Sequence, residues 1–188
     1  MCIRDRHVNR YVDWAVGGWK VSMNAVMYSG FPITLGSSNQ SGSNNGGGAR
    51  ANQYHKLTIV NRSLAHWFGT GLDALPCQAT TAPAGGGAPL NTNGVPCAYG
   101  SELTNSFGTA NVGTERAPGF RDVDASAFKQ FHTYKEQFVQ FRADAFNVGN
   151  ISSYAAPAAT ATTTATFGQI TSNLSPPRQI QLSLKYEF

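Results

Sequence analysis

The sequence predicts an all-β protein in which antiparallel strands form a segment of a transmembrane β-barrel with long extracellular loops. Four segments of about ten residues alternate apolar and polar side chains, which is the pattern of a strand with lipid on one side. Long segments rich in Gly, Ser, Asn, Thr, Ala and Pro separate some of them, and structureless loops of such length are uncommon in compact soluble domains. No apolar run reaches the length of a transmembrane helix, which excludes a helical membrane protein.

The composition agrees with a barrel and argues against nucleic-acid binding. The 188 residues suffice for one domain with a core. Only 13% of them are charged, which is about half the usual share. The formal net charge of +4 is small and the Lys and Arg residues are scattered, so we expect no nucleic-acid partner.

The positions of the strands follow from the alternation. The first strand is expected over residues 17–34, with Pro32 near its end, where a proline is tolerated. The other three are expected over residues 120–131, 137–148 and 178–188. The shared apolar face carries Val21, Met23, Val123, Ala125, Ala127, Val139, Phe141, Ala143, Ala145, Ile180, Leu182 and Leu184.

The fourth strand alternates without a break. Its apolar face carries Ile180, Leu182, Leu184, Tyr186 and Phe188. Soluble domains usually end in frayed polar residues, so a terminal aromatic residue behind an apolar face indicates contact with lipid. We expect these five residues to form an assembly signal for the barrel-assembly machinery.

The connections between the strands are strongly unequal in length. A short turn joins the second and third strands, whereas residues 35–119 and 149–177 form long loops. Outer-membrane barrels have short periplasmic turns and long external loops, and the strand parity places both long loops outside the cell. The aromatic girdle expected at the periplasmic interface consists of Trp14, Trp19, Phe128, Phe131, Tyr134, Phe138, Tyr186 and Phe188.

Four strands cannot close a barrel, because single-chain barrels begin at about eight strands and an open sheet edge cannot face lipid. Either several copies assemble, or the chain is a fragment of a longer protein whose N-terminal barrel is missing, and we favour the fragment. Residues 1–16 are expected to be a leader and a periplasmic turn, and residues 1–6, which carry no secretory signal, to be foreign to the natural protein. Residues 17–188 then hold the barrel strands and their loops.

Several blocks of sequence follow these strands in order. They are GGWKVS (17–22), YSGFPIT (28–34), PGFRDVD (118–124), FK (128–129), FRADAFNVGN (141–150), FGQITS (167–172) and PRQIQL (177–182). Together they resemble TonB-dependent outer-membrane receptors of the Oar-like, carboxypeptidase-regulatory-domain-containing group. Ala125 and Ala127 depart from the larger aliphatic residues that are typical of the second strand in that family.

The resemblance implies a barrel of about 22 strands with an internal plug, in which this chain supplies the last four. It implies energy-coupled import of a scarce, bulky ligand across the outer membrane of a Gram-negative bacterium. The implied partners are outer-membrane lipid, the barrel-assembly machinery, the missing barrel and plug, the TonB system through that missing part, and an unidentified imported ligand.

The loops contain one candidate crosslink. Cys77 and Cys97 each follow a proline and enclose a Gly-, Pro- and Thr-rich stretch, which a disulfide would close in an oxidising compartment. The alternative is two unpaired thiols. The histidines lack ligand spacing, and the motifs CxxC, HExxH and GxSxG are absent, so we expect no metal, no cofactor and no enzymatic activity.

Two groups of side chains are candidates for contact with a ligand. The first group is expected to face the barrel lumen and consists of Asp122, Asp124, Arg142, Asp144 and Lys185. One interpretation is functional, in which these charges line the ligand path or contact the plug. Alternatively, they pair with charges on neighbouring strands, and we favour this second interpretation. The second group lies in the loops, where contact with an external ligand and self-packing are equally open for Tyr54, His55, Trp67, Phe68 and Tyr99.

Two other classes of function stay open at this point. The first is a different outer-membrane barrel, such as a porin, an adhesin or an enzyme. The second is a secreted carbohydrate-binding β-sandwich, whose apolar strand faces would pack on one another.

Overall fold

The computed structural model describes residues 10–38, 49–134 and 136–188. The chain divides into two compact units, here named the sheet unit (Met1–Met27, Arg121–Ser152, Ser175–Phe188) and the loop unit (Tyr28–Phe120, Ser153–Leu174). Residues 1–6, which we expected to be foreign, lie outside the described residues. The secondary structure is mostly strand, so the all-β prediction is confirmed.

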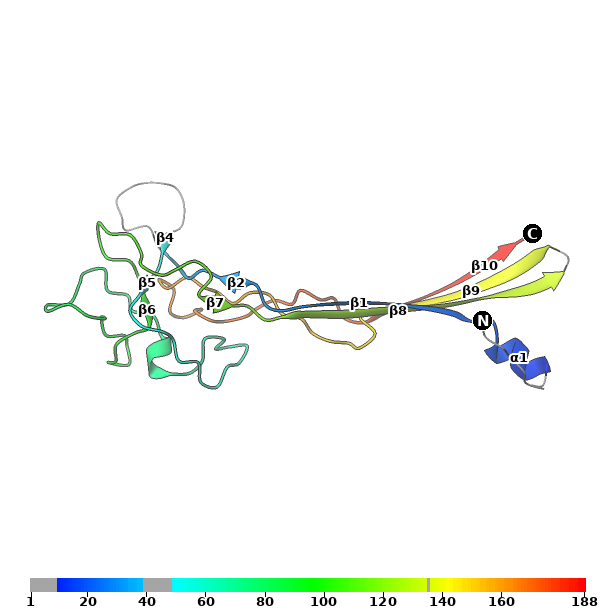
Figure 1. Ribbon diagram of the computed structural model, residues 1–188, viewed down its shortest axis with the longest axis horizontal. Helices are drawn as coiled ribbons and strands as arrows, with labels where there is room; N and C mark the ends of the chain where they lie inside the picture. The colour runs from blue at the N-terminus through cyan, green and yellow to red at the C-terminus, as the bar shows by residue number, and fades with distance from the viewer. Residues whose placement is uncertain (1–9, 39–48, 135) are drawn as a thin grey trace. The chain divides into compact units, whose positions relative to one another are not determined.

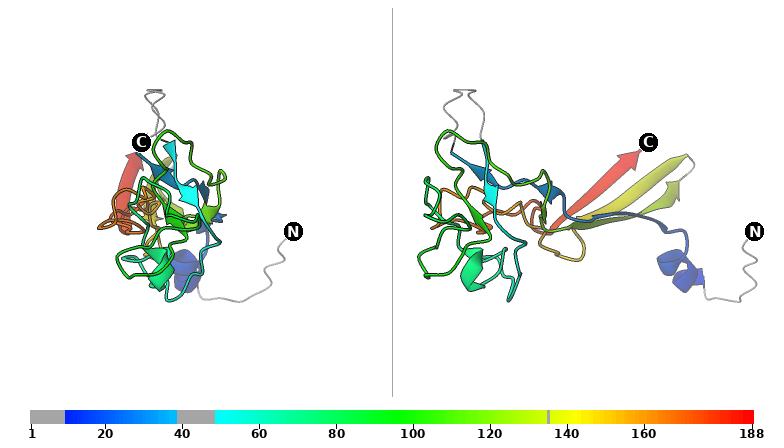
Figure 2. Two further views of the ribbon diagram at one scale, coloured as in Figure 1. Left: turned by 90° about the vertical axis from the view of Figure 1, so that its left-hand side faces the viewer. Right: turned by 60° about the vertical axis from the view of Figure 1, so that its left-hand side comes forward.

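Within the described residues, four strands form the main sheet. Their order is β1 (Lys20–Tyr28), β8 (Phe120–Tyr134), β9 (Gln137–Phe146), β10 (Gln179–Glu187). β9 pairs antiparallel with β8 on one side and with β10 on the other. The three strands lie side by side in Figure 1 and in the right-hand view of Figure 2. This order is the up-and-down arrangement of a barrel wall.

The register of the main sheet aligns side chains of one kind across neighbouring strands. The apolar rows are Ala125–Ala145–Ile180, Ala127–Ala143–Leu182 and Phe131–Val139–Tyr186. The polar rows are Ser126–Asp144–Gln181, Phe128–Arg142–Ser183 and Gln130–Gln140–Lys185. Ser22 of β1 extends a polar row, because its Oγ lies 2.7 Å from Ser126 Oγ. Directly opposed residues project to the same side, so the sheet has one apolar and one polar face.

β1 ends at Tyr28, well before the expected end at residue 34. Gly30 follows in close contact with another segment, because a Cβ built on it would lie 1.7 Å from the carbonyl oxygen of Ala117. Only glycine permits this approach. The next residues form β2 (Pro32–Ile33), which pairs with β7 (Glu115–Arg116) instead of lengthening β1.

The other strands also differ slightly from their expected limits. β8 continues three residues beyond residue 131, with a register irregularity between His132 and Tyr134. β9 stops at Phe146 because Asn147 adopts a φ of +48°, a left-handed conformation that asparagine tolerates. The Asn147 amide then accepts from the Ile151 N–H at 2.8 Å, which fixes the turn.

The residues expected to form long loops, 35–119 and 149–177, contribute most of the folded loop unit. Its further strand pairs are β3 (Gly36–Ser37) with β4 (Ala49–Arg50) and β5 (Asn52–Gln53) with β6 (Tyr99–Gly100), beside the 3-10 helix η1 (Leu72–Ala74). The buried core consists of Leu35, Ala51, Leu57, Phe68, Ala74, Ala98, Tyr99, Ala110, Ala161 and Phe167. Segments distant in sequence therefore share one hydrophobic core.

A short helix, α1 (Arg10–Val16), lies where the sequence predicted only a leader and a turn. It belongs to the sheet unit. Among the residues that the structure describes, no helix is long and apolar enough to cross a membrane.

Candidate functional site

The polar face of the main sheet carries all five residues predicted to face a lumen. Alternation along each strand and the register between strands place on it Asp122, Asp124, Arg142, Asp144 and Lys185. A hollow of about 370 Å³ lies on this face, and Ser22, Asp124, Arg142 and Gln181 contribute to its lining. All four strands of the sheet therefore contribute to one polar surface.

The charges on this face pair along their own strand, not across the sheet as we expected. Arg142 Nε donates to both carboxylate oxygens of Asp144, at 3.0 and 2.8 Å. Lys185 forms an ion pair with Glu187. Both pairs join residues i and i+2, which project from the same face of a strand. The cross-strand neighbours of Arg142 are Phe128 and Ser183, which offer no opposite charge.

The two other aspartates have different environments. Asp124 Oδ1 accepts a hydrogen bond from the backbone N–H of Asn147 at 3.0 Å, so Asp124 holds the turn that follows β9. Asp122 Oδ1 is buried and has no hydrogen-bond partner within the described residues. A buried acceptor without a partner costs about 1–3 kcal/mol. Asp122 is therefore the polar-face group that would gain most from a bound donor.

The opposite face of the sheet is apolar and open. Side chains near the middle of the outer strands are strongly exposed, with 73% of Val21, 70% of Met23 and 73% of Leu184 accessible. Ile180 and Leu182 are exposed to a similar extent. A contiguous apolar surface of this kind marks a protein or membrane contact.

Aromatic side chains gather at the end of the sheet that holds the β8–β9 hairpin. The Trp14 and Phe131 rings lie 5.1 Å apart, and the Trp19 and Phe141 rings lie 6.1 Å apart. The girdle prediction is wrong for Phe128 and Phe138, which the register places on the polar face opposite Arg142 and Glu187. The side chain of Tyr134 lies outside the described part of the chain.

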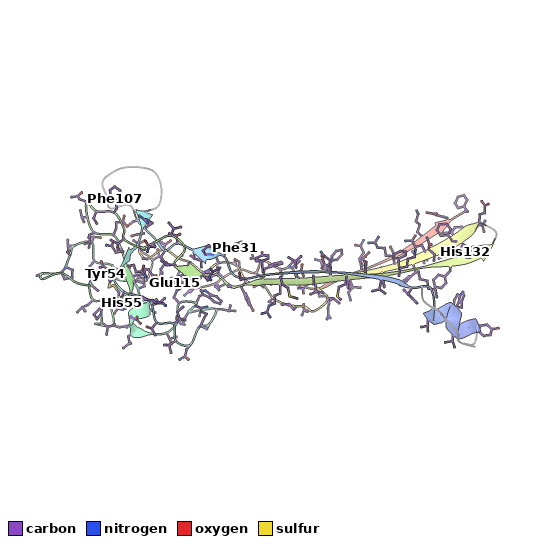
Figure 3. All side chains as sticks on the ribbon, in the orientation of Figure 1. Phe31, Tyr54, His55, Phe107, Glu115 and His132 are labelled. Carbon is purple, nitrogen blue, oxygen red and sulfur yellow. A yellow bond between two sulfur atoms is a disulfide. The ribbon has the colours of Figure 1, made fainter. Side chains whose placement is uncertain are left out.

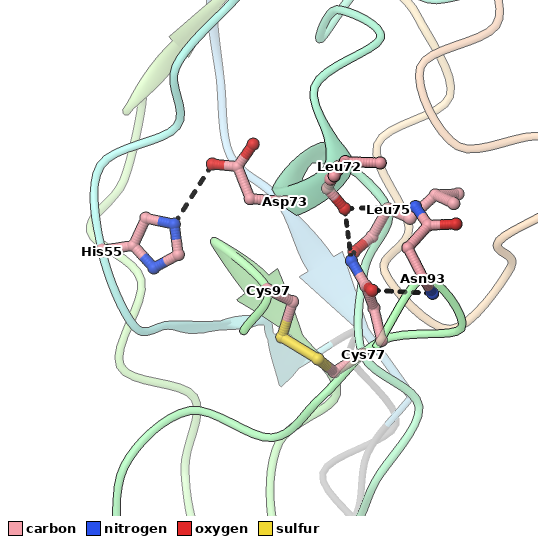
Figure 4. A network of polar contacts seen from close by, with 8 residues as sticks. His55, Leu72, Asp73, Leu75, Cys77, Asn93 and Cys97 are labelled. Carbon is pink, nitrogen blue, oxygen red and sulfur yellow. Dashed lines mark hydrogen bonds and ion pairs between the residues drawn. A yellow bond between two sulfur atoms is a disulfide. The ribbon is translucent and has the colours of Figure 1, made fainter. Parts of the chain in front are cut away.

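The loop unit contains a disulfide between Cys77 and Cys97, both fully buried, with their Cα atoms 5.8 Å apart (Figure 4). Within the enclosed loop, the Asn91 amide donates to the carbonyl oxygens of Leu72 at 2.6 Å and Leu75 at 3.1 Å. The loop is thus tied to the segment around η1 by a covalent bond and by hydrogen bonds.

Two of the loop aromatics for which ligand contact and self-packing were equally open are core residues. Phe68 and Tyr99 are each 2% exposed, so self-packing explains both of them. Trp67 is only partly buried, and its Nε1–H donates to the Arg116 carbonyl oxygen at 2.7 Å. His55 is exposed and lies 3.2 Å from the Asp73 carboxylate (Figure 4).

Burial raises the pKa of Tyr99 to about 12, and the negative charge of the nearby Glu115 carboxylate acts in the same direction. The Tyr99 hydroxyl donates to Glu115 Oε1 at 3.1 Å. The neutral phenol is therefore part of the folded loop unit over the physiological pH range.

The loop unit also displays features that the sequence did not single out. Phe31 is 64% exposed and Phe107 is 70% exposed (Figure 3). A pocket of about 240 Å³ is lined by the core rings of Phe68 and Phe167 together with His66 and Asn93. These features depend on contacts between distant segments, so no local sequence pattern marks them. Within the described ranges, no group of three or more His, Cys, Asp or Glu residues has the arrangement of a metal site.

A strand order that follows the sequence, with one exposed apolar face and one polar face, defines the wall of a membrane β-barrel. The comparison with protein families agrees with this class. The family model described as "Outer membrane beta barrel domain" matches residues 3–181, and the chain belongs to this family. The protein is therefore located in the outer membrane. No curated protein and no solved structure matches the chain.

Proposed function

We propose that this chain is part of a TonB-dependent receptor that binds a scarce, bulky ligand at the cell surface and imports it. In this proposal the chain supplies barrel strands and surface loops. Coupling to the TonB system belongs to a plug and barrel region outside these residues.

The observation that carries the proposal is the folded loop unit. A passive pore needs only short or flexible connections, whereas this unit has its own buried core and a disulfide. The same unit exposes apolar side chains such as Phe31 and Phe107. A preformed surface reduces the entropy lost when a ligand binds. The sequence blocks that resemble the receptor family support the same function, because all of them except FGQITS (167–172) fall on or beside β1, β8, β9 and β10.

The polar face of the main sheet fits the lumen side of such a receptor. It offers both charge signs, from Arg142 and Lys185 and from the aspartates, together with the partnerless oxygen of Asp122. A neighbouring plug or a passing ligand would supply the missing donor. The apolar face would meet outer-membrane lipid.

We also propose that β10 carries the signal for assembly. Its apolar row is open along its whole length, from Ile180 at 65% to Phe188 at 97% exposed. Within the described residues β10 is an edge strand that pairs only with β9, so its other edge is open to pairing with a strand of the barrel-assembly machinery.

The test compares the parent strain with strains that lack this gene or the tonB gene. Uptake of labelled ferric chelates, cobalamins and oligosaccharides is measured at concentrations that limit growth. The proposal expects at least one ligand whose uptake disappears in both deletion strains. Uptake that needs this gene but persists without TonB would instead assign a passive porin. Normal uptake of every ligand combined with a loss of surface attachment would assign an adhesin.

A loop variant separates ligand binding from barrel integrity. Phe107→Ser changes an exposed side chain of the loop unit, and Thr92→Ser is a matched change at another exposed loop position. If Phe107 contacts the ligand, only Phe107→Ser lowers uptake, and the amount of barrel in the membrane stays the same in both variants.

A further inference from the structure

Lys129 occupies an unexpected place in the sheet. In the β8–β9 register it lies opposite Phe141, and Leu184 of β10 lies opposite Phe141 on the other side. This row belongs to the apolar face, two residues from the row of Ala127. Lys129 is nevertheless only 4% exposed, whereas Leu184 in the same row is 73% exposed. Something other than the sheet therefore covers the lysine.

The covering element is α1 together with the residues that follow it. Lys129 Nζ donates to the backbone carbonyl oxygen of Trp14 and to that of Ala15, the latter at 3.3 Å. Both carbonyls lie in the last turn of α1, where the carbonyl groups have no partner within the helix. The negative end of the helix dipole thus meets the ammonium group.

Aromatic rings complete the surroundings of the ammonium group. Lys129 Nζ lies 4.8 Å from the ring centre of Phe131, 5.7 Å from that of Trp14 and 5.8 Å from that of Trp19. Cation–π attraction of this kind is stronger where water is excluded. The Trp14 and Phe131 rings also contact one another, which fastens the helix to β8 through side chains.

This arrangement addresses a specific difficulty of membrane barrels. A bare lysine on the lipid face is unfavourable, and the penalty grows with depth below the interface. Lys129 lies five residues before the end of β8, which corresponds to roughly 16 Å along the strand. Carbonyl oxygens and rings replace water around the ammonium group. Lys129 is thereby compatible with lipid as long as α1 stays in place.

The outer surface of α1 is itself apolar. Tyr11 is 81% exposed, Val12 50%, Trp14 64% and Val16 69%. Trp19 and Val21 continue this surface directly into the exposed apolar face of β1. Because that face meets the lipid of the outer membrane, the helix is continuous with an established membrane surface. Tryptophan and tyrosine are the side chains that favour the boundary between headgroups and acyl chains.

We propose that α1 is an interfacial anchor, which lies in the headgroup–acyl boundary at the β8–β9 hairpin end of the barrel and is fastened there by Lys129. The partner is the phospholipid surface of that leaflet, not a protein. This proposal rests on the outer-membrane location and is independent of the import function. Its failure would therefore leave the receptor proposal untouched, and the converse also holds.

The first experiment measures the depth of α1. The full-length protein is reconstituted in bilayers of phosphatidylethanolamine and phosphatidylglycerol, with Cys2→Ser removing the cysteine outside the disulfide. Spin labels are attached to Val12→Cys and Val16→Cys, with Leu184→Cys as the lipid reference and Thr92→Cys as the water reference. The expected ratio of oxygen to nickel-chelate accessibility at Val12 and Val16 lies between the two references. A ratio equal to that of Thr92 would overturn the anchor.

The second experiment tests the role of Lys129 with the same labels. Lys129→Met keeps a side chain of similar length but removes the ammonium donor, and Lys129→Arg keeps a cation. Lys20→Met is a matched control, because Lys20 is exposed and lies over the Phe128 ring on the polar face. We expect only Lys129→Met to move both labels towards the water reference. Unchanged label depth in Lys129→Met, or failure of that variant to insert while Lys20→Met inserts, would overturn the fastening role.

Discussion

Arg142 and Asp144 form a two-point ion pair along one strand, with Arg142 Nε 3.0 and 2.8 Å from the two carboxylate oxygens. The aspartate side chain is the less accessible partner, at 17% against 52% for the arginine. The pair neutralises two charges on the polar face without linking β9 to its neighbours. Register in this part of the sheet must therefore depend on the backbone ladder and on the apolar rows.

A double-mutant cycle on this pair should yield a small coupling free energy. We expect about 0.5 kcal/mol between Arg142→Ala and Asp144→Ala, because half of the arginine is solvated. The measurement is unfolding by urea in detergent micelles. Lys185→Ala with Glu187→Ala is the matched cycle on the other same-strand pair, and it should give less, since both partners are more exposed. A coupling of several kcal/mol for Arg142 and Asp144 would show that the pair is desolvated in the complete barrel.

The two faces of β10 should respond differently to the same charge. Leu182→Arg places a guanidinium on the apolar face near the middle of the strand and should destabilise the inserted state by about 2–4 kcal/mol. Ser183→Arg places the same group on the polar face and should be nearly neutral. The fraction of protein with heat-modifiable gel mobility after membrane extraction measures the difference. Equal insertion of the two variants would contradict the lipid-facing assignment.

Replacing Phe188 by Asp tests the assembly signal separately. Phe188 is 97% exposed, so its loss should leave the folded sheet intact but lower the rate at which the protein enters the membrane. Pulse-chase labelling of membrane fractions would measure this rate. The conservative change Phe188→Tyr is the control, and a normal rate for Phe188→Asp would argue against a role for the terminal ring.

Removal of the disulfide should loosen the loop unit and spare the main sheet. The bridge joins residues separated by 20 positions, for which the loop-entropy model gives about 3 kcal/mol. Cys77→Ser combined with Cys97→Ser should therefore increase protease cleavage within the loop unit, while heat-modifiable mobility of the barrel persists. Cys2→Ser controls for thiol loss alone. If the double variant lost both the protease resistance of the loop unit and the heat-modifiable mobility of the barrel, the two units would fold together.

Alkaline pH should destabilise the loop unit through Tyr99. Because its folded pKa is raised to about 12, the neutral form is favoured in the folded state. Its contribution is complete below the unfolded pKa of about 10 and is lost as pH rises from about 10 to 12. Protease resistance of the loop unit should fall over this window. Tyr99→Phe should remove that part of the pH dependence. The ultraviolet absorbance of tyrosinate would follow the ionisation of Tyr99 independently.

The period-two pattern allowed the two faces of the sheet to be predicted, because alternation is a property of each strand alone. The same pattern contained Lys129, which follows Ala127 by two positions and therefore falls on the apolar face. The predicted apolar face of the second strand ended at Ala127 and so omitted the lysine. Apolar residues four apart, such as Val12 and Val16, were similarly a local sign of α1 within residues 1–16.

By itself, the sequence determined the all-β class, the outer-membrane location and the side from which each strand residue projects. The physical reason is that strand period and lipid-facing composition are local. Only the tertiary structure decided that Phe68 and Tyr99 are core residues, that Arg142 pairs within its own strand, and that a helix covers Lys129. These features arise where distant segments meet, and the free energy of such contacts depends on neighbours that no local pattern specifies.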